Sequence, residues 1–244
     1  MLIQSVNSLQ IIGAIFAMGF GSLVQGSVGF GMALVAVPLI ALINPILVPG
    51  PILVCGFVLS VLVTIRDGRS IDVSGLGWAL GGRVIGSLVG AMILTYLNGA
   101  ALSITFGTII ILMVGISALG IYIPQSLRNI GIAGICSGIT GTTVSIGGPP
   151  MALIYQNEKG ARLRSTLSGF FIFGTIISIS SLITVGQFRM PHLITGLTIA
   201  PGVIIGFFIS NILKVHVDKH SAKKYILALS GLGGVIIIVR ALVN

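Results

Sequence analysis

Six uninterrupted apolar stretches, each about long enough to cross a membrane, constrain this chain more than any other feature. A helix rises 1.5 Å per residue, so about 20 apolar residues span the hydrocarbon core of a bilayer. The stretches are 46–65, 74–94, 100–121, 165–185, 192–213 and 222–242. Only 7% of the 244 residues are charged, whereas a soluble domain has about a quarter. We therefore predict an all-α integral membrane protein that folds as a helical bundle.

Two further apolar stretches are broken by glycine-rich segments. Residues 8–43 contain GSVGFGMALVAVP, from Gly26 to Pro38, and residues 129–156 contain GITGTTVSIGGPP, from Gly138 to Pro150. The first stretch is too long for one crossing and the second is interrupted near its middle. We expect each to form a hairpin of two half-helices that enters the membrane and returns to the same side. The alternative is that each stretch crosses the membrane once.

The basic residues favour the hairpins. In that arrangement one side of the membrane collects nearly all of them, at 66–69, 128, 159–164 and 214–224. Arg189 and Arg240 alone lie near the other side. The positive-inside rule makes the crowded side cytoplasmic and places both termini outside. The net charge of +9 is thus a topology signal, and we expect no nucleic-acid partner.

The chain also repeats itself weakly. GGRVIGSLVGAMIL (81–94) aligns with PGVIIGFFISNIL (201–213), so that Gly82, Gly86 and Gly90 fall on Gly202, Gly206 and Ser210. We interpret this four-residue spacing as a close helix contact. Residues 1–122 and 123–244 then form two inverted repeats of one transmembrane domain, each a broken hairpin plus three spans, as in many secondary transporters. Chance similarity between glycine-rich membrane segments is the alternative.

The breaks predict an interior anion site. Irregular backbone survives at membrane depth only where protein buries it or where it lines a wet cavity. A returning half-helix would begin at each break, with free N–H groups and a partial positive charge. Glycines there let an anion approach the backbone, and hydroxyls add donors. The candidate substrate-binding residues are Ser27, Gly29, Gly31, Thr142, Thr143, Ser145, Gly147 and Gly148.

Arg83 is the other candidate substrate-binding residue. It lies roughly 13 Å along its predicted span, where an ionisable residue is a functional candidate by default. All four acidic residues are predicted to lie in loops, so no carboxylate is available at that depth. We predict that Arg83 contacts an anion. Snorkelling to the surface and pairing with backbone carbonyls are the alternatives.

The sequence contains no sign of an enzyme or a metalloprotein. Cys55 and Cys136 lie in apolar segments without metal-ligand spacing, and we expect both to be small buried side chains. No nucleophile with a base, phosphate loop or dinucleotide fingerprint occurs, so we expect no cofactor and no metal. The start, MLIQSVNSLQ, lacks the basic region of a signal peptide, so the first apolar segment is expected to be retained.

The two glycine-rich segments resemble a known family. GFGSLVQGSVGFGMALVAVPLIALI, GICSGITGTTVSIGGPPMALIYQ and the loop RDGRSID are similar to the sulfite exporter TauE/SafE family of membrane permeases. The resemblance covers essentially the whole chain and implies outward transport of sulfite, sulfoacetate or other sulfonates across the bacterial inner membrane. The matching positions are Gly26, Gly29, Gly31, Pro38, Gly141, Gly147, Gly148 and Pro149. The family's commoner triple-glycine run is replaced here by GFG and GGPP, a departure that bears on substrate size.

We therefore expect an anion exporter. With the cytoplasm negative, each departing negative charge gains about 2.3 kcal/mol per 100 mV, roughly a fortyfold gradient, so no coupling ion is required. A sodium site made of backbone carbonyls at the breaks remains an alternative. A channel-like anion pore is the rival function, and a membrane-embedded enzyme is a third. The expected partners are a small anion, membrane lipid and, as an option, a second copy in a homodimer.

Overall fold

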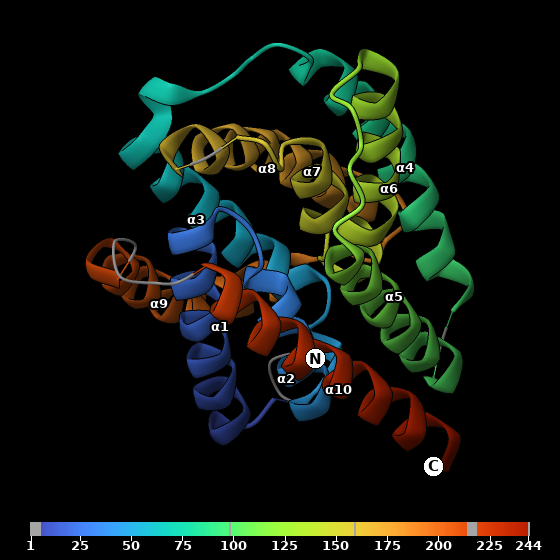
Figure 1. Cartoon of the computed structure of the whole chain (residues 1–244). Coiled ribbons are helices and arrows are strands. Elements are labelled where there is room, and N and C mark those ends of the chain that lie inside the picture. Colours follow the sequence, from blue (N-terminus) through green and yellow to red (C-terminus); the bar gives the residue numbers. More distant parts are fainter. Residues whose placement is uncertain (1–5, 98, 159, 214–218, 244) are drawn as a thin grey trace.

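The computed structural model describes residues 6–97, 99–158, 160–213 and 219–243, which contain helices and connections and no strand. Figure 1 shows the helices as one bundle. They are α1 (Ser8–Val28), α2 (Met32–Ile43), α3 (Gly50–Asp67), α4 (Leu76–Tyr96), α5 (Gly99–Leu119), α6 (Leu127–Val144), α7 (Gly148–Ile154), α8 (Gly160–Thr184), α9 (Met190–Leu213) and α10 (Lys219–Val243), with short 3₁₀ turns η2 (Pro45–Leu47) and η3 (Gly68–Ser70).

Seven of the described helices are long and apolar enough to cross a membrane, judged by length and composition: α1, α3, α4, α5, α8, α9 and α10. Six of them coincide with the six uninterrupted stretches of the sequence, which confirms those spans. The seventh, α1, comes from the first broken stretch. The chain is therefore a multi-pass membrane protein with an all-helical bundle.

The chain reverses direction at both breaks. The Gln10 side chain donates to the Ile43 carbonyl at 3.5 Å and accepts from Asn44 Nδ2 at 3.3 Å, so α2 ends beside the start of α1. Gln156 Nε2 donates to the Ile121 carbonyl at 3.2 Å, which brings the segment after α7 to the connection before α6. These contacts confirm the two hairpins.

The two helices of each hairpin differ in length, which corrects the expectation of paired half-helices. The outgoing helices α1 and α6 contain 21 and 18 residues, about 31 and 27 Å. The returning helices α2 and α7 contain only 12 and 7 residues. A Cβ atom placed on Gly21 would lie 2.6 Å from the Met32 carbonyl oxygen, and Ser137 Oγ donates to the Gly147 carbonyl at 2.6 Å. Each returning helix thus begins beside the middle of its outgoing partner.

Each outgoing helix packs along a long helix from the other half of the chain. α1 packs on α9 and α6 packs on α4, and Figure 1 shows α4 and α6 side by side. Cβ atoms on Gly82 and Gly86 would overlap carbonyl oxygens of α6, and Cβ atoms on Gly202 and Gly206 would overlap those of α1. The predicted close contact is confirmed, because only glycine lets these backbones approach so far.

The helix pairings follow a regular pattern. α3 packs on α8 and α5 on α10, while α3–α9 and α2–α10 have counterparts in α8–α4 and α7–α5. Exchanging α1–α5 for α6–α10 in order therefore maps α1–α9, α3–α9 and α2–α10 onto α6–α4, α8–α4 and α7–α5, and maps α3–α8 and α5–α10 onto themselves. Two repeats would produce this pattern. The opposite orientation of the halves and their boundary near residue 122 stay predictions.

The two cysteines lie in different environments. Cys55 is buried in α3, with its Sγ 3.3 Å from the Gly196 carbonyl. Cys136 is exposed, which corrects the expectation that it is buried. The reason is the register of α6, because the neighbouring Ser137 and Gly138 occupy the face that packs inward.

We expect cysteine labelling to place the C-terminus outside and the α7–α8 connection in the cytoplasm. In Figure 1 the α3–α4 connection and the start of α6 lie at one end of the bundle, and the C-terminus lies at the other. With Cys55 and Cys136 replaced by alanine, Val243→Cys should react with an impermeant thiol reagent from outside and Asn157→Cys only from inside. Labelling of Val243→Cys from the cytoplasm would contradict this topology.

Candidate functional site

Both helix breaks border one small cavity inside the bundle. Its volume is about 50 Å³, several times the roughly 10–15 Å³ that one water needs. The start of α2 lies on one side, the start of α7 on another, and α3, α4 and α8 complete the wall. The lining residues are Gln25, Gly31–Leu34, Ile52, Leu53, Gly56, Ser60, Arg83, Ser145–Pro149, Phe171 and Thr175.

Arg83 is the only charged side chain in this lining. It is 3% exposed and is held by neutral groups of α6 and α8. Nη1 donates to the carbonyl oxygen and Oγ of Ser137, the latter at 2.7 Å, Nη2 donates to Ser178 Oγ at 3.0 Å, and Nε donates to the Gly174 carbonyl at 3.4 Å. The predicted alternative of carbonyl pairing is therefore observed, together with a position on the cavity wall. Snorkelling is not observed.

Three glycines make room for the guanidinium group. A Cβ atom on Gly141 would lie 2.6 Å from both Nη1 and Nη2, one on Gly147 would lie 2.5 Å from Nη1, and one on Gly174 would lie 3.1 Å from Nε. Any side chain at Gly141 or Gly147 would displace the arginine. Glycine is therefore needed at both positions to leave space for the Arg83 guanidinium group.

The charge of Arg83 has no acidic partner among the described residues. The three acidic residues described there pair with other arginines at one end of the bundle. These pairs are Asp67 with Arg66 and Arg164, Asp72 with Arg162, and Glu158 with Arg162. Asp67 is the last residue of α3 rather than a loop residue as predicted. Burying an uncompensated cation is costly, so an anion in the cavity would be stabilised.

The short helices present backbone donors to the cavity. The Met32 N–H bonds to Gln25 Oε1 at 3.2 Å, whereas helix geometry leaves the next two amides, of Ala33 and Leu34, without an intrahelical acceptor. At the start of α7, Pro149 and Pro150 have no N–H, so Gly148 supplies the donor. Both prolines occupy the first turn, where a missing N–H costs no hydrogen bond within the helix.

The structure brings five of the nine predicted binding residues to the cavity: Gly31, Arg83, Ser145, Gly147 and Gly148. Ser145 Oγ already donates to the Pro49 carbonyl at 3.1 Å. Gly31 has a φ of 113°, in the left-handed region that favours glycine, and it precedes the first residue of α2. Backbone conformation therefore explains this glycine at the first break.

The other four lie outside the lining. Ser27 and Thr143 donate to carbonyls of their own helices, at 2.8 Å each, and Gly29 packs against Arg164. Thr142 Oγ1 lies 2.8 Å from Ser178 Oγ, so it supports a direct partner of Arg83. The structure thus brings none of these four to the cavity.

Three polar residues on the cavity wall were not predicted: Gln25, Ser60 and Thr175. Gln25 is 6% exposed and caps the start of α2. Ser60 Oγ is buried without a hydrogen-bond partner among the described residues. A polar side chain within an apolar span was the available signal for all three.

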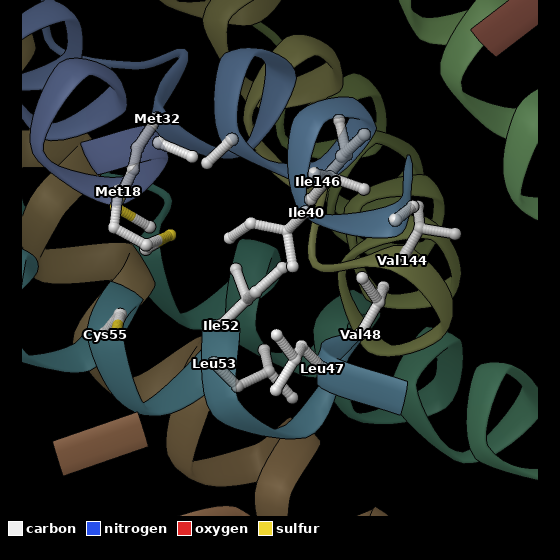
Figure 2. Close-up of a cluster of buried hydrophobic side chains, with 14 of the residues drawn as sticks. Met18, Met32, Ile40, Leu47, Val48, Ile52, Leu53, Cys55, Val144 and Ile146 are labelled. Carbon is white, nitrogen blue, oxygen red and sulfur yellow. The ribbon is translucent and has the colours of Figure 1, made fainter. Parts of the chain in front are cut away.

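The rest of the wall continues into an apolar core. Figure 2 shows Met18, Met32, Ile40 and Ile52 from α1, α2 and α3 gathered with Ile146 from the second break. Met32, Ile52 and Ile146 belong to both the core and the cavity wall. The polar groups therefore face a largely apolar surface, which strengthens their electrostatic effect.

A multi-pass bundle whose two broken hairpins meet at a buried cavity with a few polar groups is typical of membrane transport proteins. A search of protein families supports this class and narrows it. The chain belongs to the sulfite exporter TauE/SafE family, whose model matches residues 14–242. Neither the curated proteins nor the solved structures that we searched contain a match. Family membership indicates a membrane transporter of sulfite or related anions and confirms the resemblance seen in the sequence.

Proposed function

We propose that the chain exports a small sulfur-containing anion, such as sulfite, sulfoacetate or another sulfonate, across the bacterial inner membrane. The anion binds in the cavity beside Arg83. One observation carries the proposal: Arg83 is a buried cation without an acidic partner among the described residues, at the place where both helix breaks meet.

The donors around the cavity suit a tetrahedral or pyramidal oxyanion. Four hydrogen bonds hold the guanidinium group, which has five N–H donors, so one donor remains for a ligand. The amides of Ala33, Leu34 and Gly148 add neutral donors from two directions. Sulfite and sulfonates carry three oxygens that accept such bonds together, which favours them over a monatomic anion.

Export of this anion needs no coupled ion. The inside-negative potential drives each charge outward by about 2.3 kcal/mol per 100 mV. Proton relays usually place carboxylates within the membrane. Here the described carboxylates lie at one end of the bundle, in pairs with arginines. A uniporter is the mechanism that fits this charge distribution.

Flux into proteoliposomes tests the proposal. Uptake of sulfite and sulfoacetate should saturate, should follow a potential set with potassium and valinomycin, and should persist when a proton gradient alone is collapsed. Flux that does not saturate would favour a channel-like pore, and flux that stops with the proton gradient would contradict uniport.

Gly148→Leu should reduce this flux about tenfold or more while the protein stays folded, because a blocked site loses most of its binding energy. Gly148 lines the cavity, and a Cβ atom there has room, with its nearest neighbour, Phe30 Cβ, at 3.4 Å, so we expect the leucine side chain to occupy space beside the first amide of α7. Gly81→Leu is the control, since a Cβ atom there meets nothing within 4 Å. Gly31→Leu is less informative because it strains a left-handed residue. Normal flux in Gly148→Leu would place the substrate elsewhere.

A further inference from the structure

Within the described part of the chain, buried hydroxyl groups without a hydrogen-bond partner occur mainly on α3 and α8. Four buried side-chain oxygens of the described residues lack a hydrogen-bond partner: those of Ser22, Ser60, Thr64 and Ser168. Three of the four belong to α3 and α8, which pack against each other. A serine or threonine in a membrane helix usually satisfies its hydroxyl on its own backbone, as Ser27 and Thr143 do. The three exceptions are free to bind water or an anion that lies between α3 and α8.

Helix register places these hydroxyls in a row. On α3, Ser60 lines the cavity, Thr64 follows one turn later, and Asp67 ends the helix. Residues three and four apart share a helix face. The row on α3 therefore leads from the cavity to the end of the bundle where the ion pairs lie.

The same register holds on α8. Arg164 begins the face near the ion pairs, Ser168 lies one turn later, and Phe171 and Thr175 line the cavity. The spacing again keeps all four residues on one face. Each helix thus contributes hydroxyls to a seam with the cavity at one end and charged residues at the other.

A single ion pair closes the seam. Arg164 Nε donates to Asp67 Oδ2 at 2.7 Å, and this pair joins α8 to α3. Arg66 bonds to the same carboxylate but is also held by the Gly26 carbonyl at 2.7 Å and by Asn211 Oδ1 at 2.6 Å. Loss of the Asp67–Arg164 pair would remove the ion pair that joins α8 directly to the end of α3, while Arg66 keeps α1, α3 and α9 together and Asp72 still holds the start of α8 through Arg162 and Thr166. Two arginines also share one carboxylate, so this end retains a positive charge that attracts anions.

We infer that the transported anion passes between the cavity and this end of the bundle along the α3–α8 seam, and that the Asp67–Arg164 ion pair is the gate of this path. This inference rests on the proposed function. The seam hydroxyls donate hydrogen bonds to the anion in place of water as it moves. When the Asp67–Arg164 ion pair breaks, Arg66 and Arg164 bind the anion at the end of the seam. The neighbouring cavity of about 270 Å³ that includes Val28, Phe30 and Ser117 is a poorer path, because its wall is mainly apolar.

Cysteine accessibility tests the path without measuring transport. In the full chain with Cys55 and Cys136 replaced by alanine, we would introduce Ser60→Cys, Thr64→Cys, Ser168→Cys or Ser117→Cys one at a time. The probe is methanethiosulfonate ethylsulfonate, an anionic thiol reagent, applied to the cytoplasmic side of inverted vesicles. The three seam cysteines should react and Ser117→Cys should not. A reactive Ser117→Cys with unreactive seam positions would overturn the inference.

A second labelling experiment tests the Asp67–Arg164 ion pair as the gate. Asp67→Asn should raise the labelling rate of Thr64→Cys about tenfold, the equivalent of one charge-assisted hydrogen bond. Asp72→Asn is the matched control, since its pair with Arg162 lies at the same end outside the seam. An equal increase of the labelling rate in both variants would indicate that the whole end of the bundle has become more accessible, and it would contradict a specific gate at Asp67–Arg164.

Flux measurements separate this inference from the proposed function. Thr64→Val with Ser168→Ala should slow sulfite flux about tenfold with anion binding unchanged, because two polar contacts of the moving ion are lost. Ser22→Ala removes an unsatisfied hydroxyl from the α1 face that packs on α9, and it should leave flux unchanged. If the seam cysteines react but no sulfite flux is measured, the path along the seam is supported and the proposed substrate is contradicted. Normal flux in the double variant would reject the path and retain the function.

Discussion

Arg83→Gln is expected to weaken sulfite or sulfonate binding by roughly 1.5–3 kcal/mol, or about 10- to 150-fold, the value of a charge-assisted hydrogen bond. Arg83→Lys should recover only part of the loss, because an ammonium group keeps the charge but has only three N–H donors, whereas the guanidinium group holds its neighbours with four and offers a fifth to the ligand. Thermal stabilisation of the purified protein by added anion measures both effects, since a ligand at 100 times its Kd contributes about 2.7 kcal/mol.

The same arginine gives an opposite expectation for stability. Its acceptors keep other partners: Ser137 Oγ bonds to the Gly147 carbonyl and Ser178 Oγ pairs with Thr142. Arg83→Met therefore removes a buried charge without leaving a polar side chain unpaired. Without anion, its melting temperature should equal or exceed that of the wild type.

Arg240→Met is the control for both measurements, because Arg240 is exposed and donates only to the Leu42 carbonyl among the described residues. It should leave anion binding unchanged. Wild-type affinity in Arg83→Gln, or a large loss of stability in Arg83→Met, would show that the arginine serves packing alone.

Gly86→Leu should leave no folded protein in the membrane. A Cβ atom there would overlap the Ile135 carbonyl oxygen and lie 2.9 Å from Gly138 Cα, so α4 and α6 would have to separate. Backbone atoms cannot move away by changing rotamer. Even where neighbouring side chains can adjust, overpacking lowers the free energy of unfolding by about 1–3 kcal/mol. Gly206→Leu should fail equally, because its Cβ would overlap the Gly19 carbonyl oxygen.

Gly81→Leu is the matched control on the same helix, since it faces outward with open space around its Cβ. Detergent extraction and size-exclusion chromatography of tagged variants would measure the folded fraction. Normal accumulation of Gly86→Leu would mean that the close approach of α4 and α6 is unnecessary for the fold.

The sequence was sufficient for the spans, the hairpins and the close helix contacts, because each depends on local composition or spacing. It was insufficient at the glycines of α1. Gly26 was assigned to the break, but α1 continues through it and places it against Ser210, while the left-handed residues are Gly29 and Gly31. A glycine that breaks a helix and a glycine that packs against one are identical in sequence.

The surroundings of Arg83 could not be predicted for a different reason. Its partners Ser137, Gly174 and Ser178 are 54 to 95 residues away in the chain. Only the packing of α4 against α6 and α8 brings them together. The depth of the arginine could be counted along one helix, whereas its hydrogen bonds depend on how three helices meet.

The packing of α1 against α9 has a consequence for how the chain is made. About 160 residues separate the end of α1 from the start of α9. A ribosome adds about 5–20 residues per second, so on the order of ten seconds pass between the synthesis of α1 and that of α9, whose glycines pack against it. During that time the first hairpin must reside in the membrane with its contact face against lipid or the insertion machinery. Assembly of this bundle is therefore completed late, when the last quarter of the chain threads back beside the first helix.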